Sequence, residues 1–172
     1  MAESPETPPV TVRPARAADA PAIWSVHARA IRMSAVSHYT ESEVEAWASR
    51  ATPESYVDAM RTRRLVVAEV PSSDGPRVVG FGQLHPGEGV VEAIYVDPDW
   101  QRQGIGTALF RALERDARAA GLPGLMLDAS INSVPFYAAM GCRQEGLDRH
   151  ELAPGVHIDC VVMDKRFTAE AA

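Results

Sequence analysis

The stretch from Val90 to Gly106 constrains the fold of this chain more than any other part of its sequence. It begins with a run of β-branched and aromatic residues, Val90–Val96, which is typical of a strand. Asp97 and Pro98 then turn the chain, and a helix with clear 3.6-residue periodicity follows from about Gly104 to Ala120. The sequence therefore predicts a strand, a short loop and a long amphipathic helix in direct succession, with two glycines at the start of the helix.

Glycines at the start of a helix favour an anion site. The N–H groups of the first turn lack helical partners and lie at the positive end of the helix dipole, and a glycine lets a ligand approach without a Cβ in the way. A pyrophosphate is the natural occupant of such a site. Alternatively, Gly104 and Gly106 only permit a tight entry into the helix. For a bare G-x-G this second interpretation would be favoured.

Two other phosphate-binding motifs fail at this position. A P-loop requires a lysine after its last glycine, and no lysine follows Gly106. The dinucleotide fingerprint requires a glycine almost directly after the strand, whereas seven residues separate Val96 from Gly104. It also requires a small residue where Leu109 stands, although Asp128 does lie where its acidic residue is expected. A nucleotide-dependent kinase or reductase is therefore disfavoured.

The remaining periodicities predict a mixed α/β chain with one domain. Further strands are expected at 10–13, 65–70, 78–84, 125–127, 144–152 and 156–167, and further helices at 19–32, 40–47, 52–63 and 133–140. No repeat and no internal linker interrupts this order. We expect residues 1–9 to be a disordered lead-in, residues 10–168 to form the domain and residues 169–172 to be a tail.

Charge and composition disfavour several classes of protein. The 172 residues carry a formal net charge of −6 at pH 7, which argues against binding to a nucleic-acid backbone. No apolar run reaches the roughly 18 residues of a membrane span, and the acidic, proline-rich first nine residues do not resemble a secretory signal. Cys142 and Cys160 lack a metal-binding spacing, and a hairpin around Pro154 would hold them about 20 Å apart, too far for a disulfide. We therefore expect a cytoplasmic protein with no nucleic acid, membrane or metal as a partner.

Two motifs together resemble the GNAT acyltransferase superfamily. Gln101–Gly106, which reads Q-R-Q-G-I-G, matches its Q/R-x-x-G-x-G/A signature, and the strand before it ends in the usual apolar-Val-x-Pro segment. Asn132–Cys142 is similar to the family's N-x-x-A-x-x-F-Y-x-x-x-G-F segment with a shorter spacer, although Cys142 stands where an aromatic residue is usual. The element order agrees from Val10 to Phe167. The resemblance implies a mixed, mostly antiparallel twisted sheet of about seven strands, flanked by four to five helices.

The resemblance also implies acetyl-coenzyme A as the co-substrate. The backbone of Ile94–Val96 would pair with the pantetheine amides like an added strand, and the N–H groups from Arg102 to Thr107 would hold the pyrophosphate. Asn132 would contact the cofactor arm. The full set of residues implied in cofactor binding is Ile94, Tyr95, Val96, Arg102, Gln103, Gly104, Ile105, Gly106, Thr107, Asn132, Phe136 and Tyr137.

Acetyl transfer needs an uncharged amine, a donor for the developing oxyanion and an acid for the departing thiolate. A backbone N–H of Ile94–Val96 would be the oxyanion donor. Tyr137 would be the acid, because the resemblance places it near the sulfur and the reference pKa of tyrosine, about 10, lies near that of an alkyl thiol. Glu92 would be the base, because it lies two residues before Ile94 and would share its face of the strand. The alternatives are a core aromatic for Tyr137 and a solvated edge carboxylate for Glu92.

Histidines are rival bases, although each alone is more often a surface or core residue; the candidates are His27, His38, His150 and His157. In the superfamily, the early helices and the last two strands wall the acceptor site. The acceptor-lining candidates are accordingly His38, Tyr39, Trp47 and His150.

We thus expect an N-acetyltransferase that moves an acetyl group from acetyl-CoA to a primary amine by direct attack in a ternary complex, with a small-molecule acceptor favoured over a protein. The alternative is a regulatory module that binds acetyl-CoA without turnover. Tyr137 and Asn132 speak against it, because a pure binder needs no thiolate acid. The acceptor and the oligomeric state stay open, with Val161 and Met163 as candidate positions for a homodimer contact.

Overall fold

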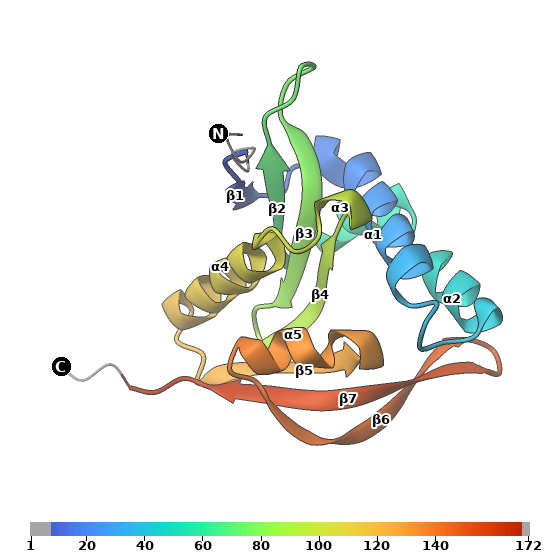
Figure 1. The fold of residues 1–172 in the computed structure, drawn as a ribbon. Helices are drawn as coiled ribbons and strands as arrows, with labels where there is room; N and C mark the ends of the chain where they lie inside the picture. Colours follow the sequence, from blue (N-terminus) through green and yellow to red (C-terminus); the bar gives the residue numbers. More distant parts are fainter. Residues whose placement is uncertain (1–7, 170–172) are drawn as a thin grey trace, which may run out of the picture.

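A seven-stranded sheet in the order β1-β2-β3-β4-β5-β7-β6 organises the computed structural model, which describes residues 8–169 (Figure 1). Every neighbouring pair is antiparallel except β4 and β5, which are parallel. The predicted mixed, mostly antiparallel sheet is therefore confirmed. The strands are β1 (Thr11–Pro14), β2 (Arg64–Val70), β3 (Arg77–His85), β4 (Val90–Val96), β5 (Gly124–Ser130), β6 (Arg143–Ala153) and β7 (Val156–Arg166). Residues 1–7 of the predicted lead-in and residues 170–172 of the predicted tail lie outside the described residues.

Five α-helices accompany the sheet, close to where the sequence predicts helices. They are α1 (Ala20–Ser34), α2 (Glu41–Ala48), α3 (Pro53–Ala59), α4 (Ile105–Ala119) and α5 (Val134–Ala139). The predicted capping box before α2 is formed, because the Thr40 side chain accepts the N–H of Glu43 and the Glu43 carboxylate accepts the N–H of Thr40. In contrast, α3 ends at Ala59, earlier than the predicted Arg63.

Helices cover both faces of the first four strands, and β2 shows this most clearly. Leu65 and Val67 belong to the cluster formed with α1 and α3, whereas Val66 and Ala68 belong to the cluster formed with α4. Because neighbouring residues of a strand point to opposite faces, a strand covered on both sides must be apolar throughout. This explains the uninterrupted apolar run Leu65–Ala68 of β2.

Two glycines of β3 let α4 pack directly on the strand. A Cβ added at Gly80 would lie 3.1 Å from Cδ1 of Leu109, and one added at Gly82 would lie 3.1 Å from Cδ1 of Leu113. Both leucines are fully buried. Any side chain at these two glycines would push α4 away from the sheet, so the glycines fix the position of the helix start as well.

A third apolar cluster attaches α2 to the hairpin of β6 and β7. Val44 and Ala48 of α2 pack against Leu152 and Ile158, one from each strand of the hairpin. In Figure 1, α2 lies beside the far end of this hairpin, away from α4. Helix α2 and the hairpin of β6 and β7 therefore line the same region of the molecule.

The sheet opens between β4 and β5. These two strands pair only at Val90 with Met126 and at Val91 with Leu127. Beyond these pairs, the rest of β4 is paired with β3 alone and the rest of β5 with β7 alone. Figure 1 shows the two strands running in different directions from their meeting point. One backbone edge of β4, including Ile94, is therefore left without a strand partner.

Glu92 does not share the face of Ile94, contrary to the prediction. The register of β3 and β4 shifts after Gln83, which leaves Glu92 as an extra residue of β4 at a bulge. Val91 and Ile94 consequently both pack on the α4 side, and Glu92 lies on the opposite face, where it contacts Gln83. Strict alternation fails here because one residue has been inserted.

The proposed dimer positions are also wrong. Val161 is 9% exposed and Met163 is fully buried, and both belong to the core under α4. Neither side chain can reach a second molecule.

Among the described residues, no helix combines the length and the apolarity needed to cross a membrane.

Candidate active site

A cavity of about 1430 Å³ occupies the opening between β4 and β5. Pockets for a single small molecule have volumes of roughly 300–1,000 Å³, so this one has room for two reactants. The predicted cofactor residues line it, with the exception of Gln103: Ile94, Tyr95, Val96, Arg102, Gly104, Ile105, Gly106, Thr107, Asn132, Phe136 and Tyr137.

The start of α4 presents free backbone donors to this cavity. Gly104 is the N-cap with φ of 78°, and Ala108 donates the first helical hydrogen bond to its carbonyl. Within residues 8–169, no group accepts the N–H groups of Ile105, Gly106 or Thr107. Three unpaired donors at the positive end of a 15-residue helix are the arrangement that favours a bound anion. This supports the ligand interpretation of the glycines over a merely tight helix entry.

Arg102, in the loop before α4, has φ of 61°, a left-handed conformation that glycine adopts much more readily. It is the one non-glycine residue with positive φ in the part of the chain described here. Backbone strain of this kind concentrates where a loop is shaped around a ligand. The loop is thus held in a costly conformation beside the anion site.

Asp97 and Arg29 fix this loop to the rest of the fold. Asp97 is only 3% exposed, and its carboxylate accepts the N–H of Asp99 and pairs with the guanidinium of Arg29 from α1. Arg29 reaches Asp99 as well, at 3.1 Å. These residues were missed by sequence reasoning, which treated Asp97–Pro98 only as a turn.

Gly106 is required for contact with α5. A Cβ at Gly106 would lie 3.2 Å from Cε2 of Phe136, a ring that also packs edge-on against Phe110 and Tyr137. The two sequence motifs, one in α4 and one in α5, therefore touch in space. Phe136 lines the cavity from this position.

Asn132 carries an unsatisfied acceptor. Its Oδ1 atom is buried and has no hydrogen-bond partner among the residues that the structure describes. An unpaired buried amide oxygen costs about 1–3 kcal/mol, so a donor from a bound molecule would stabilise this arrangement. Asn132 lies on the cavity wall, where a ligand amide N–H could supply that donor.

Tyr137 is 7% exposed and reaches the cavity from α5. Its hydroxyl makes no hydrogen bond to any described residue. Burial, with smaller contributions from Tyr95 and Cys142, raises the pKa of Tyr137 above its ordinary value. Burial therefore makes this phenol a weaker acid than free tyrosine, and the hydroxyl stays protonated and available as a donor at any physiological pH.

Glu92 lines the cavity but its carboxylate is occupied. The guanidinium Nε of Arg63 lies 2.9 Å from Oε2, and the side-chain amide of Gln83 donates to the same oxygen at 2.6 Å. The structure thus places the predicted base on the cavity wall, with both Arg63 and Gln83 bound to its carboxylate.

The candidate histidines lie in different surroundings. His38 lines the cavity beside Ser37, whereas His157 does not line it and faces Glu151 at 3.9 Å. His27 lies in the core beside the hydroxyl of Tyr56, and burial, aided by nearby Arg50, lowers its pKa to about 4. His27 is therefore a neutral core residue.

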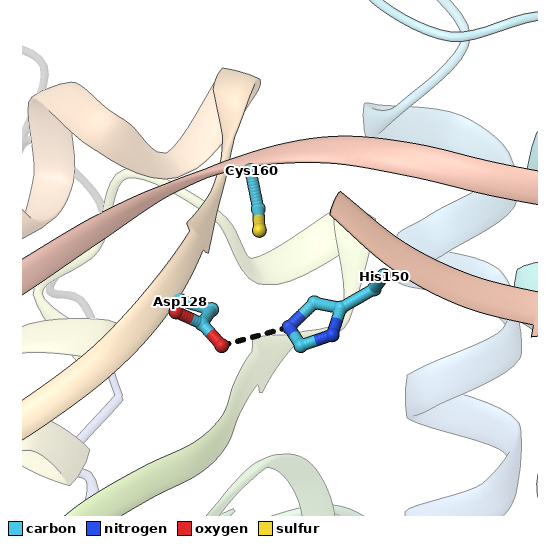
Figure 2. Close-up of side chains that lie close together, drawn as sticks. All are labelled: Asp128, His150 and Cys160. Atoms are coloured by element: carbon cyan, nitrogen blue, oxygen red, sulfur yellow. Dashed lines mark ion pairs between the residues drawn. The ribbon is translucent and has the colours of Figure 1, made fainter. Parts of the chain in front are cut away.

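His150 differs from the other histidines because it has a carboxylate partner inside the cavity. Its Nε2 atom lies 2.8 Å from Oδ2 of Asp128, and both residues line the cavity. The thiol of Cys160 completes a cluster whose ligand-type atoms all lie within 4.8 Å of one another (Figure 2). Figure 2 shows the three side chains converging from β5, β6 and β7.

Of the predicted acceptor-lining residues, His38, Trp47 and His150 lie on the cavity wall. Tyr39 does not. Its hydroxyl donates to the carbonyl of Asp159 at 2.9 Å and accepts the N–H of Ile131 at 2.8 Å. Tyr39 is therefore a buried cross-link between β7 and the segment before α5, and it stiffens the wall rather than facing the acceptor.

Comparison with known proteins agrees with this geometry. The family model described as an acetyltransferase (GNAT) domain matches residues 35–165. The uncharacterised N-acetyltransferase YafP of Escherichia coli (strain K12) is 25% identical over 132 residues, which cover 77% of this chain and 80% of YafP. A GCN5-related N-acetyltransferase structure from Rhodopseudomonas palustris has a TM-score of 0.82 at 28% identity, over 97% of this chain and 99% of the other. The PaiA N-acetyltransferase of Thermoplasma acidophilum, solved with coenzyme A, shares the fold with a TM-score of 0.69 at 18% identity, over 92% and 99% of the two chains.

The chain belongs to the GNAT acetyltransferase family. Its matched relatives and structural neighbours are N-acetyltransferases, and this chain is an N-acetyltransferase of that family.

Proposed function

We propose that this protein transfers an acetyl group from acetyl-CoA to a primary amine of a small molecule, by direct attack within a ternary complex. The observation that carries the proposal is the unpaired edge of β4 beside the free N–H groups of α4. An open strand edge can pair with the amides of pantetheine, and the helix start can hold a pyrophosphate. Coenzyme A contains both groups in one molecule.

The cofactor arm would run along β4 between these two points. Ile94–Val96 would offer backbone groups to the pantetheine amides, and Arg102–Thr107 would surround the pyrophosphate. The buried Oδ1 of Asn132 would accept a hydrogen bond from the arm. The coenzyme A complex of the similar PaiA enzyme supports the same ligand for this fold.

Tyr137 would protonate the departing thiolate. The amine nitrogen attacks the thioester carbonyl carbon, the C–S bond breaks as the tetrahedral intermediate collapses, and the phenol donates its proton to sulfur. The free hydroxyl of Tyr137 and its position on the cavity wall support this role. A backbone N–H of the β4 edge would stabilise the oxyanion of the intermediate.

His150 is better supported as the base than Glu92. Asp128 occupies Nε2 of the ring, and the other ring nitrogen, Nδ1, has no partner in the described part of the chain. The carboxylate would stabilise the imidazolium that forms when Nδ1 takes the proton of the attacking amine. The carboxylate of Glu92, by contrast, is already paired with Arg63 and Gln83. Exchange with solvent returns both Tyr137 and His150 to their starting states.

The experiment that tests the proposal is a panel of amines assayed for release of free thiol from acetyl-CoA. Polyamines, aminoglycosides, amino acids and peptides with free N-termini cover the small-molecule and protein classes. Thermal shift with acetyl-CoA, ATP and NADH in parallel identifies the nucleotide ligand, because a ligand that binds only the folded state raises stability. A thermal shift with acetyl-CoA and no transfer to any amine would favour the regulatory module.

A further inference from the structure

The cluster of Asp128, His150 and Cys160 contains more than an acid–base pair needs. Cys160 is opposite Ser130 of β5 and Asp148 of β6, so it is central in the three-strand segment. Asp128 and His150 each lie two residues from those partners along their own strands. Because residues two apart share a face, all three side chains point to the same side of the sheet.

These three residues carry the donor atoms that zinc prefers. Zinc binds thiolate sulfur, imidazole nitrogen and carboxylate oxygen, and sites that take part in reactions have three protein ligands and one open position. The three candidate ligand atoms here lie within 4.8 Å of one another, and all three residues line the cavity. A fourth position would therefore face the cavity and accept water or a substrate amine.

The geometry requires only small side-chain movements. Zinc bond lengths of about 2.0–2.3 Å place tetrahedral ligand atoms roughly 3.3–3.8 Å apart. The pair of Nε2 and Oδ2, at 2.8 Å, would have to separate slightly, and Sγ would have to approach. The side chains of His150 and Asp128 are 44% and 33% exposed, so both can rotate toward Sγ of the buried Cys160 and close this gap.

Local charge also favours a cation at this point. Besides Asp128, the carboxylates of Asp148 and Asp159 act on Cys160, and Arg149 of β6 is paired with Asp159 at 3.3 Å. Burial and these carboxylates raise the pKa of the Cys160 thiol to about 11. The ligand would be the thiolate, so binding of Zn²⁺ would release the thiol proton to solvent.

We propose that Asp128, His150 and Cys160 form a Zn²⁺ site, and that zinc bound there blocks acetyl transfer by occupying the base. Binding of the metal is independent of the proposed function. Only the inhibition rests on the proposed function: a neutral imidazole that binds zinc through Nε2 carries its proton on Nδ1, so Nδ1 of His150 could no longer accept a proton from the amine. This proposal departs from the sequence-based prediction of no metal, which could not foresee the site because the three ligands come from three separate strands.

Cobalt substitution tests the site on the full chain, kept reduced with a non-thiol reductant. We expect one Co²⁺ per chain with a thiolate-to-cobalt absorption band, and displacement of this band by Zn²⁺. Cys160→Ser should abolish the band and weaken Zn²⁺ binding at least about tenfold. Cys142→Ser is the matched control, because Cys142 is the other buried free cysteine and lies outside the cluster. It should keep both band and affinity.

Absence of a band in the wild type, or its persistence in Cys160→Ser, would overturn the metal site. If circular dichroism shows that Cys160→Ser does not fold, His150→Ala is tested in its place. An unchanged Zn²⁺ affinity in His150→Ala would also overturn the metal site. In the transfer assay, Zn²⁺ should inhibit the wild type but not Cys160→Ser, whose rate without zinc should stay within about twofold of wild type. If no amine is acetylated at all, the proposed function fails, and the cobalt spectrum still decides the metal site.

Discussion

The carboxylate of Glu92 is paired with the guanidinium of Arg63, with 2.9 Å between Nε of the arginine and Oε2 of the glutamate. This contact engages the strand carboxylate that the sequence predicts as the base. His150 is the other candidate base, and its own carboxylate partner, Asp128, lies on a different strand.

Glu92→Gln and His150→Gln form a matched pair of tests for the base. We expect Glu92→Gln to change kcat by less than about fivefold, because its carboxylate is already paired with Arg63 and Gln83. His150→Gln should lower kcat by roughly 10²-fold, the low end for general base catalysis. Both should bind acetyl-CoA like the wild type. Steady-state rates of thiol release measure kcat for both variants. A larger loss of kcat in Glu92→Gln than in His150→Gln would restore Glu92 as the base.

Tyr137→Phe tests the acid. Phenylalanine keeps the ring packing against Phe110 and Phe136 but lacks the hydroxyl. We expect acetyl-CoA affinity to be nearly unchanged and kcat to fall by roughly 10²-fold, equivalent to about 2.7 kcal/mol of barrier. A rate within twofold of wild type would show that water protonates the thiolate. A large loss of affinity would instead make Tyr137 a cofactor contact.

Gly104→Ala tests the anion site at the start of α4. The added methyl group meets open space in the protein, but φ of 78° makes any side chain strained there, and a Cβ would intrude on a bound pyrophosphate. We expect acetyl-CoA affinity to fall about tenfold or more, which is about 1.4 kcal/mol.

Gly75→Ala is the control for Gly104→Ala. Gly75 lies in the loop between β2 and β3 with φ of 100° and open space around it. Both substitutions should lower the free energy of unfolding by roughly 1–2 kcal/mol, but only Gly104→Ala should weaken acetyl-CoA binding in a calorimetric titration. Equal affinities in the two variants would remove the argument for a pyrophosphate site.

His27 predicts how stability depends on pH. Its folded-state pKa, about 4, lies below the ordinary 6.5, so the unfolded chain takes up a proton before the folded one does. The contribution of neutral His27 is complete above pH 6.5 and is lost as pH falls through about 4. At pH 5 the loss relative to pH 7 should be about 2 kcal/mol.

Urea unfolding at pH 7 and pH 5 measures this contribution. His27→Gln cannot titrate, so its stability should fall by about 2 kcal/mol less than that of the wild type between the two pH values. The other titrating groups are the same in both chains, so their contributions cancel when the change in stability of His27→Gln is subtracted from that of the wild type. An equal fall in both would mean that His27 titrates normally in the folded state.

Local patterns in the sequence predict most of the helices and strands of the fold. The capping box at Thr40 and the periodicity of α4 specify those helices through contacts between neighbouring residues. The hairpin of β6 and β7 is also local, and the predicted turn around Pro154 is confirmed by a register that pairs Cys160 with Asp148.

The site depends on information that local patterns lack. A single-residue bulge turned Glu92 to the other face, and no period in the sequence marks that insertion. The meeting of Asp128 with His150 depends on β7 lying between β5 and β6, which is a property of the sheet order. Tyr39 seemed an acceptor-site residue because its loop lies there, but only the folded chain reveals its two backbone partners.

The most direct test of the central claim measures thiol release and acetylated amine together, with wild-type protein, acetyl-CoA and the amine panel. The account predicts thiol release that depends on the amine, with one acetylated amine formed for each thiol released. Thiol release at the rate of buffer with every amine, while acetyl-CoA still binds the protein, would contradict it.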